Sequence, residues 1–395
     1  MNASITRKLL PFCGLALAFL APAAGADAGR YKLLHNFSGN GDGAQPWDTP
    51  IEDRAGNFYG TTLTGGANKW GTVFKITPRG AVTVLYSFCS RQNCPDGQLP
   101  HAGLIADKAG NFYGTATYGG NAAGQGVVFK LAPDGTETVL YSFAGSPDDG
   151  QYPYGGLIMD KKGNFYGTTV AGGPDNDGTV FKLAPDGTET VLHSFTNSAG
   201  DGEEPMGSLV ADKHGNLYGT TQVGGGAYGL GIVFKLTPEG KETIFHTFAG
   251  APSDGGEPGA GLIMDSAGNL YGSTWTGGAN NMGSVFRLAP DGTETILHSF
   301  AGPPVEGRSP VGGLTMDKSG NLYGATYYGG ANDSGTVFQL APDGSATVLY
   351  SFCQEQNCAD GGWPVAAPIP GKCDCLYGMT DTAGEYQDGT VYKLK

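Results

Sequence analysis

The sequence is poor in charged residues, and basic ones are the scarcer kind. Charged residues make up 15% of the 395 positions, with 23 Lys and Arg against 37 Asp and Glu. Partners rich in phosphate need a basic footprint, so this balance argues against nucleic acid and anionic lipid as partners. After the N-terminal segment, no apolar stretch approaches the roughly 20 residues that cross a bilayer. We therefore expect no membrane insertion once that segment is removed.

Familiar catalytic motifs are also missing. The chain has neither a G-x-S-x-G elbow nor a phosphate-binding glycine loop, and none of its six histidines belongs to a cluster with metal-ligand spacing. His101 and His214 stand alone, on what we predict to be opposite faces. The other four share one repeat position with three tyrosines, which predicts packing within a strand: His35, His193, His246 and His298, with Tyr86, Tyr141 and Tyr350. We expect no resident cofactor, calcium excepted, and favour a protein that is not an enzyme.

The N-terminus has the order of a secretory signal peptide. Arg7 and Lys8 precede an apolar run over residues 9–20, and the small residues of "APAAGADA" follow. We assign residues 1–26 to the signal peptide, which leaves 21 basic residues against 37 acidic ones in the exported chain. The expected location is secreted or periplasmic.

Glycine is abundant, and much of it belongs to a repeat. The chain holds 69 glycines, too many for an ordinary domain. The glycine that ends a Tyr-Gly pair recurs every 52 to 54 residues: Gly60, Gly114, Gly167, Gly219, Gly272, Gly324 and Gly378. Seven units of about 53 residues indicate a propeller or a solenoid.

Each unit contains four strand-like runs. In the third unit they cover residues 156–160, 164–169, 178–183 and 189–195, with compact glycine turns inside each hairpin. Four antiparallel strands make one propeller blade. The seventh unit stops after its third strand, and residues 31–37 copy a fourth. The sequence thus predicts an all-β, seven-bladed β-propeller, a single domain over residues 27–395, whose N-terminal strand closes the last blade.

The string "GNFYGTT" at residues 56–62 returns in degenerate form in every unit. We interpret it as a fold signature. Its second glycine would allow close backbone approach near the narrow axis, and its aromatic residues would supply packing surface.

Only two kinds of loop vary in length, those between the second and third strands and those between blades. Both should emerge on one face, where insertions often mark binding. Exposed rings beside carboxylates suit sugars, although the rings could instead pack blade shoulders. The candidate ligand-binding residues on this face are Trp47, Trp70, Trp275, Trp363, Tyr118, Tyr154 and Tyr328.

Each inter-blade loop carries an acidic residue, followed by glycine and then, three residues later, by proline. A ring of carboxylates could hold calcium or attract a cationic ligand, or each could simply form an Asx-type turn. The calcium candidates are Asp42, Asp96, Asp149, Asp201, Asp254 and Asp360, and Glu306 holds the same position.

Six cysteines follow the leader, an even number that predicts disulfides in an exported chain. The matching strings "FCSRQNC" and "FCQEQNC" predict bridges between Cys89 and Cys94 and between Cys353 and Cys358. A bridge between Cys373 and Cys375 would be strained. A structural or oxidised pair and a redox pair both stay open there.

The unit "GLIMDKKGNFYGTTVAGGPDNDGTVFKLAPDGTETVLHSF" resembles the GloVer-type tandem repeat of bacterial exported, choice-of-anchor proteins. The likeness covers residues 31–395 and recurs seven times. It implies export and a propeller-like array, and it brings no catalytic residues with it. The pattern D-x-x-G-N-[FL]-Y is similar, more distantly, to NHL and SMP-30 type propellers.

Three functions stay open. The favoured one is a non-catalytic, monomeric propeller that binds carbohydrate or another extracytoplasmic ligand on the loop-variable face. The second is a polysaccharide hydrolase or lyase that uses acidic residues of that face, where a pair could flank a glycosidic bond. The third is a scaffold that binds another exported protein.

Overall fold

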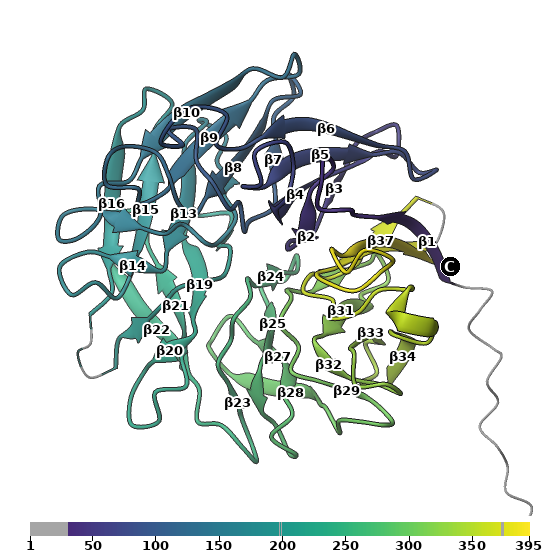
Figure 1. The fold of residues 1–395 in the computed structure, drawn as a ribbon. Coiled ribbons are helices and arrows are strands. Elements are labelled where there is room, and N and C mark those ends of the chain that lie inside the picture. The colour runs from purple at the N-terminus through teal and green to yellow at the C-terminus, as the bar shows by residue number, and fades with distance from the viewer. Residues whose placement is uncertain (1–30, 197, 199, 373–374) are drawn as a thin grey trace, which may run out of the picture.

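Seven four-stranded antiparallel sheets stand in a ring, as the computed structural model shows (Figure 1). It describes residues 31–196, 198, 200–372 and 375–395, so the expected signal peptide and Cys373 lie outside the described residues. The prediction of an all-β, seven-bladed propeller is confirmed.

Each blade runs outward from a short inner strand, and its four strands follow one another in sequence except in the last blade. From the inside outward they are β3 (Ile51–Glu52), β4 (Phe58–Thr64), β5 (Thr72–Ile76) and β6 (Val82–Ser87); β7 (Ile105–Ala106), β8 (Phe112–Ala116), β9 (Val127–Leu131) and β10 (Glu137–Ser142); β12 (Ile158–Met159), β13 (Phe165–Thr169), β15 (Thr179–Leu183) and β16 (Glu189–Ser194); β18 (Val210–Ala211), β19 (Leu217–Thr221), β21 (Ile232–Leu236) and β22 (Glu242–Thr247); β24 (Ile263–Met264), β25 (Leu270–Thr274), β27 (Ser284–Leu288) and β28 (Glu294–Ser299); β30 (Thr315–Met316), β31 (Leu322–Thr326), β33 (Thr336–Leu340) and β34 (Ala346–Ser351); and β35 (Ile369–Gly371), β36 (Cys375–Thr380), β37 (Thr390–Leu394) and β1 (Tyr31–Asn36).

The two ends of the chain close the ring. β1 pairs antiparallel with β37, from Tyr31 opposite Leu394 to Asn36 opposite Thr390. In Figure 1 the purple β1 therefore lies against the yellow β37. The predicted closure of the last blade by the N-terminal strand is confirmed.

Neighbouring blades are joined by one repeated aromatic contact. The phenylalanine that follows each outer strand packs edge-on against the aromatic residue in the third strand of the next blade. Phe88 and Phe129, for example, have ring centroids 5.0 Å apart. Six junctions use two phenylalanines, and the seventh pairs Phe352 with Tyr392 at 5.2 Å. Because these rings are fully buried, the core consists of seven interfaces between blades.

The recurring D-x-x-G-N-x-Y pattern is a hydrogen-bonded turn. Asp160 accepts the backbone N–H groups of Lys162 at 2.8 Å and Asn164 at 2.9 Å with one oxygen, and the Asn164 side chain at 2.7 Å and the Tyr166 hydroxyl at 3.2 Å with the other. Gly163 adopts φ +84°, which suits glycine in this turn. The motif therefore builds the inner hairpin.

The glycine of the Tyr-Gly pair has a different role from the one we predicted. A Cβ at Gly167 would lie 2.7 Å from Cζ of Phe181, its register partner on the third strand. The glycine thus makes room for a ring rather than for a neighbouring backbone. Close backbone approach occurs elsewhere, at Gly207, where a Cβ would lie 2.6 Å from the carbonyl carbon of Ala260.

The two variable loops share one face, as predicted. Four short ladders join an inter-blade loop to the loop between the second and third strands of the following blade: β11 (Gly150–Gln151) with β14 (Ala171–Gly172), β17 (Gly202–Glu203) with β20 (Val223–Gly224), β23 (Gly255–Gly256) with β26 (Thr276–Gly277), and β29 (Gly307–Arg308) with β32 (Tyr328–Gly329). In the first blade β2 (Ala44–Pro46) pairs with β4 instead. We call this side the loop face, and the opposite side, formed by the hairpin turns, the hairpin face.

Two disulfides close short loops on the loop face. Cys89 bonds Cys94 and Cys353 bonds Cys358, the second beside the 3-10 turn η1 (Gln356–Cys358). Both predicted bridges are confirmed. The expected pair of Cys373 and Cys375 falls partly outside the described residues.

Candidate ligand-binding site on the loop face

One residue from each inter-blade loop, the one that follows the loop proline, lines a hollow on the ring axis. These side chains differ from blade to blade: Trp47, His101, Tyr154, Met206, Gly259, Val311 and Val365. The hollow has a volume of about 80 Å³. We call the hollow, these seven residues and Asp48, which also lines it, the axial mouth, and we include Asp381, which is not part of the lining but acts electrostatically on Tyr154.

Three of the seven residues form a continuous aromatic arc. The ring of Trp47 meets His101 edge-on at 5.8 Å, and His101 stacks on Tyr154 at 4.0 Å. Nδ1 of His101 lies 2.8 Å from Oγ1 of Thr117. Burial lowers the pKa of His101 to about 4, despite a backbone hydrogen bond with Leu99 that acts in the opposite direction. The imidazole is therefore neutral at pH 7, and the arc presents ring faces and edges without positive charge.

Asp48 breaks the repeat beside this arc. The other blades place only Gly or Ala at its position. Its two carboxylate oxygens accept the backbone N–H groups of Thr49 and Gly103, each at 2.5 Å. Burial raises the pKa of Asp48, and these two hydrogen bonds act against that rise. In the wall of the hollow, the carboxylate of Asp48 thus connects backbone N–H groups at the start of the first blade and at the start of the second.

Asp381 is a second carboxylate that breaks the repeat. Only 4% of the residue is exposed, and no hydrogen bond or ion pair to its carboxylate occurs among the described residues. Burial raises its pKa to about 6. Its charge also contributes, after burial, to the raised pKa values of Tyr154 and Tyr327. Asp381 therefore lies near the aromatic arc and lacks a partner of its own.

Small residues form the rest of the wall. Gly155, Gly207 and Gly312 belong to the lining, and a Cβ at any of them would lie within 3 Å of backbone atoms of the next blade. The blades therefore meet tightly around the axis. Enclosed sites for whole drug-sized ligands occupy roughly 300 to 1,000 Å³, so this hollow can take only part of such a molecule.

The aromatic residues predicted for a site do not all come together. Trp47 and Tyr154 line the hollow, and five do not: Trp70, Trp275, Trp363, Tyr118 and Tyr328. Trp70 is 41% exposed and Tyr118 37% exposed, both in loops between second and third strands. Tyr328 lies under the Arg308 guanidinium, 4.5 Å from ring centroid to Cζ. The predicted aromatic residues thus divide between the lining of the hollow and other places on the loop face, and of the latter Tyr118 lies near enough to Tyr154 to contribute to its raised pKa, after burial.

The loop carboxylates are hydrogen-bonded within their own loops. Asp149 accepts the Tyr141 hydroxyl at 2.9 Å, the Ala144 N–H at 2.6 Å and the Gly150 N–H at 2.6 Å. Carboxylates of the other six loops accept a backbone N–H close to the end of the preceding strand in the same way. This geometry supports the turn reading of these acidic residues, and calcium binding by them stays a prediction.

The strand histidines pack as expected, each edge-on against the phenylalanine two residues later, and in addition they face the loop carboxylates. Nε2 of His35 lies 3.0 Å from Asp42, and Nε2 of His298 lies 2.5 Å from Glu306. The histidine takes the place that the tyrosine hydroxyl has in other blades, such as Tyr350 on Asp360 at 2.7 Å. This repeat position therefore places either a histidine nitrogen or a tyrosine hydroxyl against the loop carboxylate.

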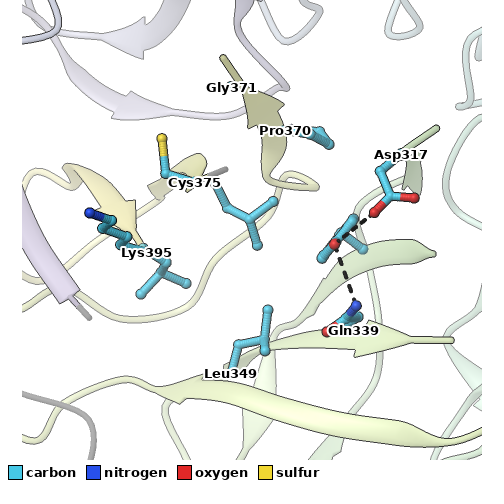
Figure 2. A pocket seen from close by; sticks show the side chains of 10 residues that line it. Asp317, Gln339, Leu349, Pro370, Gly371, Cys375 and Lys395 are labelled. Atoms are coloured by element: carbon cyan, nitrogen blue, oxygen red, sulfur yellow. Dashed lines mark hydrogen bonds between the residues drawn. The ribbon is translucent and has the colours of Figure 1, made fainter. Parts of the chain in front are cut away.

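Three hollows larger than the axial one lie on the hairpin face, between blades. Their volumes are about 860, 650 and 340 Å³. All three are lined by the Asp and Tyr of the repeated turn, whose polar groups are already paired. Figure 2 shows the 340 Å³ groove, where the Tyr323 hydroxyl joins Asp317 at 3.0 Å to Gln339 at 3.4 Å. These grooves follow from the repeat, and we place the candidate site at the axial mouth.

Sequence reasoning missed Asp48, His101 and Asp381. Each occupies a loop-face position where the other units carry different residues, so a residue-by-residue comparison of the seven units would have singled them out. The predicted site rested on Trp and Tyr rings and on the carboxylates that recur in every blade, and Asp48, His101 and Asp381 belong to neither group.

The ring of blades and its axial mouth define a seven-bladed repeat propeller with a loop-face site. The Gloeobacter/Verrucomicrobia repeat matches residues 24–227 and 205–395, so the chain belongs to this family. The predicted GloVer resemblance is confirmed. No curated protein matches the chain.

Solved structures share the fold at low identity. The extracellular domain of BT4673 from B. thetaiotaomicron, a protein assigned to the one-component systems, is 10% identical with a TM-score of 0.58, over 92% of this chain and 39% of that one. The extracellular domain of BT3049, assigned to the hybrid two-component systems of the same organism, is 12% identical with a TM-score of 0.59, over 93% and 41%. The chain thus spans about two fifths of these two structures.

A third similarity is more remote. A structure described as a gluconolactonase is 15% identical, with a TM-score of 0.41, over 76% of this chain and 89% of that one. Among the described residues, no helix has the length and apolar character needed to cross a bilayer.

Proposed function

We propose that this propeller is a non-catalytic extracytoplasmic binding module that takes the end of a carbohydrate chain at its axial mouth. The observation that carries the proposal is Asp381, a buried residue whose carboxylate has no partner among the described residues, near an arc of three aromatic rings. A buried charge without hydrogen bonds is unfavourable, and a ligand hydroxyl would supply the missing donor. Sugars combine such hydroxyls with CH faces that pack on rings.

The size of the hollow favours a chain end over an enclosed ligand. A volume of about 80 Å³ accommodates a few water-sized groups, since one water occupies about 30 Å³. A terminal sugar would insert one edge toward Asp381 and Asp48 and rest the remainder on Trp47 and Tyr154. The two disulfides and the extracellular setting of the similar domains support the extracytoplasmic location.

Glycan binding by tag-free protein of residues 27–395 tests the proposal. A glycan array selects a ligand, and calorimetry then compares variants of the mouth, Trp47→Ala and Asp381→Asn, with variants of exposed loop-face rings outside it, Trp70→Ala and Tyr228→Ala. We expect at least tenfold weaker binding in the first pair and unchanged binding in the second. Equal affinity in all four would overturn the assignment. An array without a ligand, together with capture of one exported protein, would favour the scaffold instead.

A hydrolase or lyase is the second candidate, because the mouth holds two carboxylates with raised pKa values. Asp381 has a pKa of about 6, suited to a general acid near neutral pH, and Asp48 is the other carboxylate. Release of reducing ends from a polysaccharide panel tests this reading. Activity that disappears in both Asp48→Asn and Asp381→Asn would establish it, and a panel without product at any pH would exclude it.

A further inference from the structure

The outer rim contains two clusters that local sequence spacing does not reveal. At each, a histidine from the outer strand of one blade meets the aspartate of the following loop and a glutamate that opens the outer strand of the next blade. The clusters are His193, Asp201 and Glu242, and His246, Asp254 and Glu294. In each cluster one nitrogen and two carboxylate oxygens lie within 4.8 Å of one another.

We propose that these two clusters are divalent transition-metal sites of the zinc type, each bound by one imidazole and two carboxylates. Neutral imidazole and carboxylate are both common zinc ligands, and three protein ligands leave a position for water. Calcium instead prefers six to eight oxygen ligands, which these clusters do not offer.

Distances within the clusters are longer than ordinary hydrogen bonds and lie within a few tenths of an ångström of the spacing of zinc ligands. Nε2 of His193 lies 3.7 Å from Asp201 and 3.6 Å from Glu242. Nε2 of His246 lies 3.3 Å from Asp254 and 3.7 Å from Glu294. Zinc bonds of about 2.0 to 2.1 Å in a tetrahedron place neighbouring ligand atoms about 3.3 to 3.4 Å apart.

The other junctions of the ring show what happens when a ligand is missing. Where Ala346 replaces the glutamate, His298 closes on Glu306 to 2.5 Å. Where Val82 replaces it, His35 lies 3.0 Å from Asp42. Among the described residues of the four junctions with histidine, the longer separations belong to the two where histidine, aspartate and glutamate meet, while the His298 junction also has Glu306 in place of the aspartate.

Atoms in both clusters also lack hydrogen-bond partners. Nε2 of His193 and of His246, one oxygen of Glu242 and one of Glu294 are buried and unpaired among the described residues. The side chains keep 10 to 18% of their surface exposed, so an ion can reach them. Because β16, β22 and β28 supply the ligands, bound metal would join three consecutive blades at the rim.

Metal stoichiometry tests this proposal independently of ligand binding at the axial mouth. Tag-free protein, stripped with a chelator, is titrated with Zn²⁺ in competition with a chromophoric chelator. We expect two ions per chain, one in Glu242→Gln, one in Glu294→Gln and none in the double variant. Glu189→Gln, at a junction that carries Tyr141 in place of histidine, is the matched control and should keep two.

A gain-of-site variant makes the test sharper. Ala346→Glu adds the missing ligand beside His298 and Glu306, so we expect a third ion. Co²⁺ should add visible absorption to the wild type but not to the Glu242→Gln/Glu294→Gln protein, and circular dichroism checks that each variant folds. Fewer than one ion per wild-type chain, or a count that neither Gln substitution changes, would overturn the proposal.

Discussion

The carboxylate of Asp381, which has no partner among the described residues, should contribute less favourably to folding at neutral pH than in mild acid. Burial raises the pKa of Asp381 from 3.8 to about 6. Between these two values the folded state binds the proton more tightly than the unfolded state, so stability is greatest below the lower value and falls as pH rises toward 6. A difference of about two units corresponds to about 3 kcal/mol.

The substitution Asp381→Asn keeps the shape of the side chain and removes the charge. It should therefore raise the free energy of unfolding at pH 7.5 by up to about 3 kcal/mol and change it little at pH 4. The entropy of unfolding is about 2 cal/mol/K per residue, or roughly 0.8 kcal/mol/K for the ring, so the melting temperature at pH 7.5 should rise by about 4 °C.

Calorimetric melts of both proteins between pH 4 and pH 8 measure this effect. Asp148→Asn, which changes an exposed residue, serves as the control and should leave the melting curve unchanged at every pH. Parallel pH profiles for the wild type and Asp381→Asn, or a variant that melts lower at pH 7.5, would refute the reasoning. Higher stability combined with weaker glycan binding would show that the unpaired charge serves the ligand.

Three further substitutions test the repeat architecture. Tyr392 places a fully buried hydroxyl, which has no partner among the described residues, where six blades have phenylalanine. Tyr392→Phe should therefore raise the free energy of unfolding in urea by about 1 to 2 kcal/mol, and a decrease would reveal a partner for the hydroxyl. Gly219→Ala would place a Cβ 2.5 Å from Cζ of Phe234 and should lower the free energy of unfolding in urea by about 1 to 3 kcal/mol. Adding Phe234→Leu should restore part of this loss, and additive losses in the double variant would contradict the contact. Asp160→Ala removes the acceptor of four hydrogen bonds and should cost at least about 2 kcal/mol by thermal melts, whereas an unchanged melt would show that the turn forms without it.

The structure adds residue-level causes to features that the sequence already predicted. Asp160 and its hydrogen bonds explain why the Asn-aromatic-Tyr string follows a turn, and the ring of Phe181 explains the glycine at residue 167. Neither cause was visible in the sequence. Phe181 lies on a different strand from Gly167, and the hydrogen bonds of Asp160 depend on the conformation of its side chain. The periodicity alone still led to the correct strands.

Sequence by itself determined the number of blades, the order of strands, the closure by residues 31–36 and the two local disulfides. These features depend on contacts that repeat within one unit or on the pairing of the chain ends, so periodicity reveals them. Only the tertiary structure decided that Trp47, His101, Tyr154 and Asp381 gather around the axis while Trp70 stays apart. It alone brought His193, Asp201 and Glu242 together, because a closed ring places residues from different units side by side whatever their distance along the chain.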